Sequence, residues 1–410
     1  MTKRRILFVA YGAGHIRTVL PIVQAILDDP QLGMEPVLLA LTTAASEARA
    51  AGVPCIGFAD FGDLEPEIEA WGRKLVGPAP ENSVVSYRES VAYHGRSYAD
   101  LIEIEGEERA AELYEQKGRA AFLPIPTALR VLDQLGIDAV VATNSPRAER
   151  AFLEAARLTG RPSLAIWSSL ASHEIAWIGQ PGFTSKVCVD SPYAIDQMMR
   201  SGRPTDEIVL TGNPQFDRLR RPRQAEEIEA FRAAHGWKPN EKILLFAQQN
   251  EPAVHPFTGE AGDSGLPQAL NDALCSALLR SNEPVNLCVR YHPNQVPLAL
   301  PDDPRISLSP QSENLDELLH AVDAVFTCSS TVAYQGAIIG KPTVQGLFSV
   351  FSKDVPFGAM VGARTVSDFA EMDAVWSELW QGLLPSSTLS MSGSDSAAHN
   401  VMNVLKEVLA

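Results

Sequence analysis

The sequence lacks several features that would assign it at once to a common functional class. It has no Cys-x-x-Cys pair, no Asp-x-Asp motif and no G-x-x-x-x-G-K-[ST] phosphate loop. No apolar run reaches the ~20 residues that a membrane-spanning helix needs. These absences argue against a zinc or disulfide framework, a P-loop enzyme and a transmembrane protein.

Positive charge is also in short supply. The 410 residues include 34 Lys and Arg against 50 Asp and Glu, which gives a net charge of −16. That balance argues against a nucleic-acid partner, because DNA and RNA binding needs a basic stripe. The opening residues MTKRR lead into a short apolar run that does not resemble a signal peptide. We expect a cytoplasmic protein whose scattered cysteines are buried free thiols: Cys55, Cys188, Cys275, Cys288 and Cys328.

Short apolar runs alternate with amphipathic segments along most of the chain. In the first half, strands are expected at ILFVA, VLLALTT, CIGF, DAVVATN and SLAIWSS, and in the second half at KILLFAQQ, VNLCVRYHP, AVFTCSS and PTVQG. Helical spacing lies between them, as in 15–27 and 146–158. Repeated β-α-β units predict an α/β fold with two doubly wound, Rossmann-like domains facing each other across a cleft.

The predicted domains are an N-terminal domain, 1–215, and a C-terminal domain, 216–390, followed by a C-terminal helix, 391–410. Residues 60–125 interrupt the alternation and are rich in Glu, Gly, Pro and Tyr. An insertion of this length is typical of a segment with a functional role or of a mobile lid.

Polar residues gather where the predicted strands end, which is where open parallel sheets bind ligands. Ser329, Ser330 and Thr331 follow one strand and begin a helix. Hydroxyls and unpaired amides at a helix N-terminus favour a phosphate or diphosphate, although one of the serines could serve only as a cap.

Two other strand ends carry candidate donors. His292, held by Pro293, is suited to donate to a phosphate or ribose oxygen, and its strand is expected to neighbour the strand before Ser329. Gln248 and Gln249 are candidates for binding hydroxyls of a sugar or base. The simpler alternatives are a satisfied loop histidine and ordinary loop polarity.

The first strand ends in Gly12-Ala13-Gly14-His15. The third glycine and the acidic partner of a dinucleotide-binding fingerprint are absent, so an NAD-type site is disfavoured. A catalytic base and a tight connection remain as interpretations of this loop.

Together these segments resemble the glycosyltransferase-B superfamily over almost the whole chain. GAGH followed by Pro21 is similar to the first loop of many of its members. TGNPQFDRL, RYHPNQ and CSSTVAYQGAIIGKP resemble the domain-junction, "HpNp" and diphosphate-binding segments of nonhydrolysing UDP-N-acetylglucosamine 2-epimerases. The pairing of His292-Pro293 with Ser329-Ser330-Thr331 is also similar to bacterial transferases that use CMP- or CDP-linked donors.

The chain departs from the epimerase pattern at positions that matter for chemistry. AQQNE, 247–251, stands where the epimerases have His-Arg-x-Glu-Asn, and AIWSSL, 165–170, lacks their carboxylate. Gln335 replaces their ribose-binding Glu. Without these groups the epimerases' proton abstraction is not expected.

The resemblance therefore implies a glycosyltransferase of polysaccharide or glycoconjugate biosynthesis that moves a sugar from a UDP- or CMP-linked donor to an acceptor hydroxyl or amine. His15 is the candidate base, and the acceptor side is expected at Arg17, Asn144 and Asn213. The donor is expected at these residues: Gly12, Gly14, Gln248, Gln249, His292, Ser329, Ser330, Thr331 and Gln335. No metal, no cofactor and no transmembrane segment are expected, and a homodimer stays open. The alternatives are an epimerase-like enzyme and a non-catalytic nucleotide-sugar-binding protein.

Overall fold

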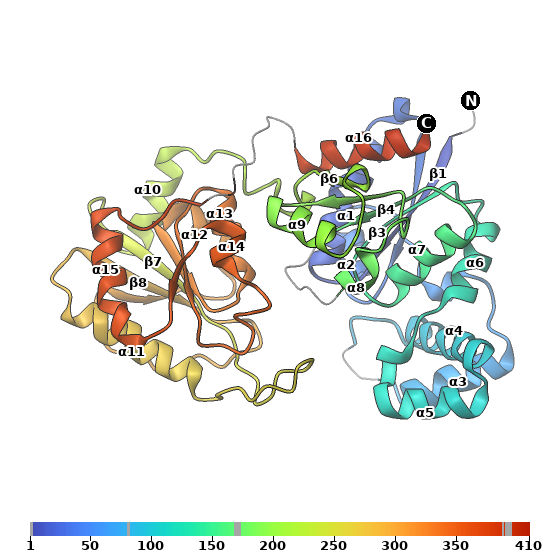
Figure 1. Cartoon of the computed structure of the whole chain (residues 1–410), viewed down its shortest axis with the longest axis horizontal. Coiled ribbons are helices and arrows are strands. Elements are labelled where there is room, and N and C mark those ends of the chain that lie inside the picture. The colour runs from blue at the N-terminus through green and yellow to red at the C-terminus, as the bar shows by residue number, and fades with distance from the viewer. Residues whose placement is uncertain (1–2, 80–82, 168–173, 388, 390–395) are drawn as a thin grey trace. The chain divides into compact units, whose positions relative to one another are not determined.

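A computed structural model describes residues 3–79, 83–167, 174–387, 389 and 396–410. They form two compact units (Figure 1). The first contains the described residues up to Asp217 and the C-terminal helix, and the second contains those from Arg218 to Leu389. Within the described residues, each unit is built on a six-stranded parallel sheet. The predicted α/β fold class is thereby confirmed.

The first sheet has the strand order β2-β1-β3-β4-β5-β6. Its strands are β1 (Arg4–Ala10), β2 (Met34–Ala40), β3 (Ala139–Thr143), β4 (Ser163–Ile166), β5 (Lys186–Val189) and β6 (Ile208–Leu210). The middle strands are almost wholly buried because helices cover both faces of the sheet. The strand expected at CIGF is wrong: only an isolated bridge joins Ile56 to Leu39.

Helices bury the apolar side chains on the two faces of this sheet. They are α1 (Gly14–Asp28), α2 (Ala44–Ala50), α6 (Ile125–Gln134), α7 (Ala148–Leu158), α8 (Ile175–Ile178), α9 (Pro192–Arg200) and α16 (Ala397–Leu409). One core contains α1 and the C-terminal helix α16, with Val401 and Leu405 among its buried residues. Asp217 caps α16 by accepting hydrogen bonds from the amides of Ala397 and Ala398 at 2.7 and 3.0 Å.

The insertion is helical in its described residues. Its helices are α3 (Pro66–Val76), α4 (Tyr87–Glu105) and α5 (Glu107–Lys117). Helices α3 and α4 pack at backbone distance, because a Cβ at Gly72 would lie 2.2 Å from the Val91 carbonyl oxygen and one at Gly95 would lie 2.3 Å from that of Ile68. An aromatic cluster that includes Phe58, Tyr93 and Phe122 joins the insertion to the first unit.

The second sheet has the order β12-β11-β10-β7-β8-β9. Its strands are β7 (Lys242–Ala247), β8 (Val285–Arg290), β9 (Ile306–Leu308), β10 (Ala324–Thr327), β11 (Thr343–Gly346) and β12 (Arg364–Val366). The helices are α10 (Ala225–Ala234), α11 (Leu266–Arg280), α12 (Leu315–Ala321), α13 (Thr331–Ile338), α14 (Phe357–Val361) and α15 (Met372–Gln381). All five cysteines are free thiols; four are buried as expected, and Cys55 is half-buried.

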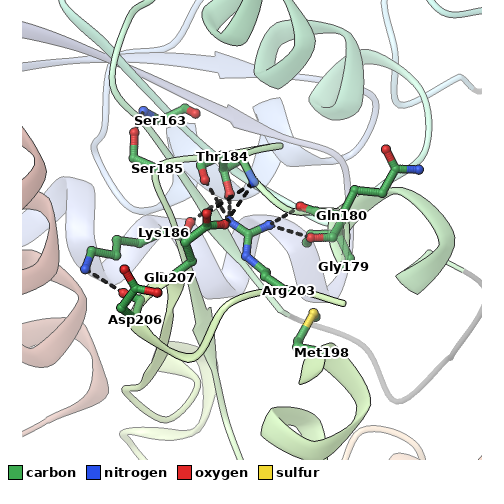
Figure 2. Close-up of polar contacts among 12 residues, drawn as sticks. Ser163, Gly179, Gln180, Thr184, Ser185, Lys186, Met198, Arg203, Asp206 and Glu207 are labelled. Carbon is green, nitrogen blue, oxygen red and sulfur yellow. Dashed lines mark hydrogen bonds and ion pairs between the residues drawn. The ribbon is translucent and has the colours of Figure 1, made fainter. Parts of the chain in front are cut away.

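A buried arginine fixes the loop between α8 and β5. The side chain of Arg203 has no exposed surface, and Figure 2 shows it reaching into this loop. Its terminal nitrogens donate to the carbonyl oxygens of Ile178 (2.6 Å) and Thr184 (2.7 Å) and lie 3.3 Å from Glu207. Burial lowers the pKa of Arg203, and the charge of Glu207 opposes that shift.

We predict that Arg203→Met destabilises the first unit by about 3–5 kcal/mol, because it leaves Glu207 and several carbonyl oxygens without their buried donor. The measurement is urea-induced unfolding followed by circular dichroism. Arg200→Met is the matched control: Arg200 is exposed on α9, and its change should stay within about 0.5 kcal/mol. An Arg203→Met protein as stable as this control would contradict the structural role.

Candidate functional site

Each sheet has one place where the strand order reverses. In the first sheet, β2 lies on one side of β1 while β3 and the later strands lie on the other. In the second sheet, the chain runs outward through β7, β8 and β9 and returns to β10 on the opposite side of β7. Connections leave toward opposite faces at such a point, which opens a crevice at the carboxyl ends of the strands. The polar residues at these two reversals are the candidate sites.

At the first reversal, His15 belongs to a hydrogen-bonded chain that ends in a buried carboxylate. His15 Nδ1 lies 2.7 Å from Thr143 Oγ1, and Thr143 Oγ1 lies 3.0 Å from Glu149 Oε1. The Tyr11 amide also donates to Glu149 Oε1, at 2.9 Å. The ends of β1 and β3 and the starts of α1 and α7 are thus held together.

These contacts fix the roles of the two imidazole nitrogens. A carboxylate oxygen only accepts, so the Thr143 hydroxyl donates to Glu149 and must accept from His15 Nδ1–H. The neutral ring then carries its lone pair on Nε2, the nitrogen suited to accept a proton. Glu149 Oε1 lies 3.9 Å from Nδ1 and would stabilise the positive charge of the protonated ring.

Glu149 was not identified from the sequence. It follows Arg147-Ala148 at the start of a helix, where a carboxylate is typical of a solvated first turn. In the structure its side chain is completely buried, and Oε2 has no hydrogen-bond partner among the described residues. A buried acceptor left without a partner costs free energy, and such groups concentrate at functional sites.

The other first-unit candidates are spread around this network. Gly12 packs against the neighbouring loop, since a Cβ there would lie 2.0 Å from Thr43 Oγ1. Arg17 is exposed and paired with Glu47 at 2.9 Å, while Asn144 is buried. Asn213 is buried and accepts from Thr18 Oγ1 at 3.1 Å. Their ligand-binding roles, and that of Gly14 at the start of α1, stay predictions.

At the second reversal, Gln249 joins the ends of β7 and β10. Its Oε1 accepts from the Ser329 amide at 3.1 Å, and its Nε2 donates to Ser329 Oγ. Because the Ser329 hydroxyl accepts from Gln249, its own proton remains available to donate. Gln249 therefore orients Ser329.

The start of α13 provides two kinds of donor. Ser330 is the N-cap, with its hydroxyl accepting from the Val332 amide at 3.3 Å, so the capping interpretation holds for this residue. Thr331 is exposed as the first helical residue, where an amide has no partner within the helix. Gln335 is half-buried one turn later, on the same face as Thr331.

Gln248 and His292 have different surroundings. Gln248 is buried, with its amide nitrogen 3.1 Å from Asn271 Oδ1 and its oxygen accepting from Gln295 at 2.8 Å. His292 is exposed, and its Nδ1 accepts from the Asn294 amide at 3.2 Å, which places the proton of the neutral ring on Nε2.

The expected adjacency of the strands before His292 and Ser329 is wrong. Strand β7 pairs with both β8 and β10 and lies between them. Two strand spacings separate the ends of β8 and β10 by about 10 Å.

The insertion holds a pocket of its own. Its volume is about 670 Å³, and its lining includes Glu69, Arg73, Tyr87 and Arg88 from α3 and α4. The lining contains no member of the His15–Thr143–Glu149 network. Among the described helices, none is long and apolar enough to cross a membrane.

Comparison with known proteins shows the fold. No protein-family model and no curated protein matches the chain. MnaA from S. aureus, solved in a co-structure with UDP, has 13% identity and a TM-score of 0.58 over 99% of this chain and 97% of its own. UDP-GlcNAc 2-epimerase from Neisseria meningitidis, bound to UDP-GlcNAc, has 11% identity and a TM-score of 0.55 over 98% of this chain and 100% of its own.

A third solved structure is equally similar in fold. MurG from Acinetobacter baumannii has 15% identity and a TM-score of 0.55 over 98% of this chain and 99% of its own. These matches confirm the expected resemblance in fold. At sequence identities of 11–15%, these similarities show a shared fold and do not establish a shared activity.

We predict that Thr143→Val breaks the connection between His15 and Glu149. The tautomer with Nδ1 protonated should lose population, because its acceptor is gone and Glu149 keeps only the Tyr11 amide. The measurement is the ring nitrogen shifts of His15 by 15N NMR, with Thr205→Val, at an exposed position, as the control. Unchanged His15 shifts in Thr143→Val would refute the hydrogen-bonded chain.

Proposed function

We propose that the protein is a glycosyltransferase that moves a sugar from a nucleotide-sugar donor to an acceptor hydroxyl or amine. The observation that carries this proposal is the His15–Thr143–Glu149 chain, which prepares His15 Nε2 to accept a proton at a strand-order reversal. The fold shared with UDP-GlcNAc 2-epimerases and MurG supports nucleotide-sugar chemistry.

The donor phosphates would lie at the start of α13. Ser329, oriented by Gln249, and the Thr331 amide and hydroxyl would donate to phosphate oxygens. The exposed His292, with its proton on Nε2, would donate about 10 Å away along the strand ends, a span that a nucleoside diphosphate covers. Gln335 would reach the ribose.

The reaction divides into proton removal and departure of the nucleotide. His15 Nε2 takes the proton of the acceptor hydroxyl or amine while the acceptor atom forms a bond to the anomeric carbon. The bond from that carbon to the donor phosphate oxygen breaks, and the electron pair leaves with the nucleotide. Glu149 stabilises the imidazolium, and the helix N-terminus at Thr331 stabilises the negative charge on the leaving group.

Epimerisation is the second candidate, favoured by the fold of the solved epimerases and by the carboxylate that the structure places near His15. That carboxylate is completely buried and bound to Thr143 and Tyr11, so it is poorly placed to take a proton from a substrate carbon. Incubation with UDP-N-acetylglucosamine alone tests this candidate, because exchange of the C2 proton in NMR spectra would establish epimerisation.

We predict that UDP, or alternatively CMP or CDP, stabilises the protein against heat. A nucleotide at about 100 times its Kd contributes about 2.7 kcal/mol, which corresponds to a rise of roughly 5–10 °C in Tm for a domain of this size. His292→Ala and Ser329→Ala should each weaken nucleotide binding about tenfold, the loss of one charge-assisted or phosphate hydrogen bond. His399→Ala, at an exposed histidine of α16, is the control. If none of the three nucleotides raises the Tm, the donor site is wrong.

We predict that His15→Ala lowers kcat for sugar transfer by about 10²–10⁴-fold and leaves nucleotide affinity unchanged, as expected for loss of a general base. Glu149→Gln keeps the size of the side chain and should also lower kcat, by a smaller factor than His15→Ala, because the imidazolium loses its counter-charge while the base remains. The measurement is release of free nucleotide in the presence of acceptor. Full transfer by the His15→Ala protein would overturn the assignment and favour a non-catalytic role for this cluster.

A further inference from the structure

Two arginines at the start of α7 have no anionic partner among the described residues. Arg147 and Arg150 are half-buried, yet neither guanidinium makes a hydrogen bond or ion pair with another described residue. Their Nε atoms are buried and unpaired. Arg232 and Arg364, which are also half-buried, differ: Arg232 lies 3.3 Å from Asp323, and Arg364 lies 2.8 Å from Glu371.

The contacts that these two arginines do make are with aromatic rings. The Arg147 guanidinium lies 5.0 Å from the ring centre of Tyr11, and that of Arg150 lies 5.4 Å from the ring centre of Trp177. A cation over a ring gains about 0.5–2 kcal/mol but uses none of the five N–H donors of a guanidinium. The rings hold the side chains in place and leave the donors for another group.

These arginines flank Glu149, the carboxylate of the His15 network, in the sequence. Arg147 lies over the ring of Tyr11, and the Tyr11 amide binds the same Glu149 oxygen that lies 3.9 Å from His15 Nδ1. Arg150 directly follows Glu149. The first turn of α7 has no side-chain cap, so its amides add to the positive potential there.

The insertion contributes one residue, Tyr93, to the surroundings of Tyr11 and Arg147. Tyr93 of α4 packs against the same core as Tyr11, and its half-buried side chain has a hydroxyl without a hydrogen-bond partner among the described residues. Burial raises the pKa of Tyr93 to about 12, while the positive charges of Arg147 and Arg119 oppose that rise. Tyr93 therefore stays a neutral donor beside Arg147.

We propose that Arg147 and Arg150 bind an anionic group of the acceptor, a carboxylate or a phosphate, beside His15. A guanidinium pairs with either group through two parallel hydrogen bonds, which fixes orientation as well as adding affinity. The identification of the ligand as the acceptor rests on the proposed function. The anion site itself rests on the unpaired arginines.

The test is arginine-specific labelling with phenylglyoxal, read out residue by residue through peptide mass spectrometry. The probes are glucose 6-phosphate, glucuronate and glucose, which present a phosphate, a carboxylate or neither. We expect glucose 6-phosphate or glucuronate to slow labelling of Arg147 and Arg150 at least threefold, whereas glucose has no effect. The probe that protects more identifies the anion. Exposed Arg200 should be labelled equally with all three.

Equal labelling of Arg147 and Arg150 with all three probes would overturn the anion site. The labelling experiment needs neither donor nor turnover, so its result is independent of the nucleotide measurements that test the proposed function. In transfer assays, an Arg147→Met, Arg150→Met double variant should raise KM for an anionic acceptor at least tenfold and leave nucleotide affinity unchanged. An unchanged KM would refute the acceptor assignment even if the anion site is present.

Discussion

The reversal of strand order beside β1 and beside β7 is the constraint on which both candidate sites depend. In a parallel sheet the connections before and after such a point leave toward opposite faces, which opens a crevice at the carboxyl ends of the two central strands. At the first reversal, His15 lies after β1 and Thr143 is the last residue of β3. At the second reversal, Gln249 lies after β7 and Ser329 lies after β10. The same topological feature thus gathers polar side chains that are more than 70 residues apart in the sequence.

Two buried charged side chains of the first unit, those of Arg203 and Glu149, differ in how fully hydrogen-bond partners compensate their burial. Arg203 is completely buried, and carbonyl oxygens and Glu207 surround its terminal nitrogens, so it stabilises a loop. Glu149 is equally buried, but one of its oxygens has no partner among the described residues, at a cost of about 1–3 kcal/mol. The first arrangement serves stability. The second keeps a buried carboxylate 3.9 Å from His15 Nδ1, which is the kind of local cost expected where a site has a function.

The central strands were predictable because they are buried on both faces and appear as continuous apolar runs, such as ILFVA and KILLFAQQ. Strands β6, β9 and β12 were not, because they have only three residues each and carry partly exposed side chains. Their pairing comes from tertiary contacts that no local pattern records.

The site residues also divide into those that the sequence identified and those that it did not. His15 and Ser329 were identifiable because each ends a strand and lies at the start of a helix. Glu149 was not, because its neighbours in sequence are typical of a solvated helix, and only packing against β1 and β3 buries it. The different surroundings of Gln248 and Gln249 follow from the alternation of side chains along an extended segment, which the sequence alone could have indicated.

The two polar clusters differ in charge, and this difference fits the division of labour in the proposed reaction. The first contains a histidine, a carboxylate and, nearby, two arginines that pair with no described residue. The second contains hydroxyls, amides and a helix N-terminus, and its nearby carboxylate, Glu251, is bound to the Ser349 hydroxyl and the Val350 amide. A carboxylate near the donor phosphates would repel them and oppose departure of the nucleotide. A carboxylate near His15 is favourable instead, because the charge that appears there during proton transfer is positive. In the proposed reaction, Glu149 would therefore stabilise the positive charge beside His15, and the hydroxyls and amides at the second reversal would stabilise the negative charge of the leaving nucleotide.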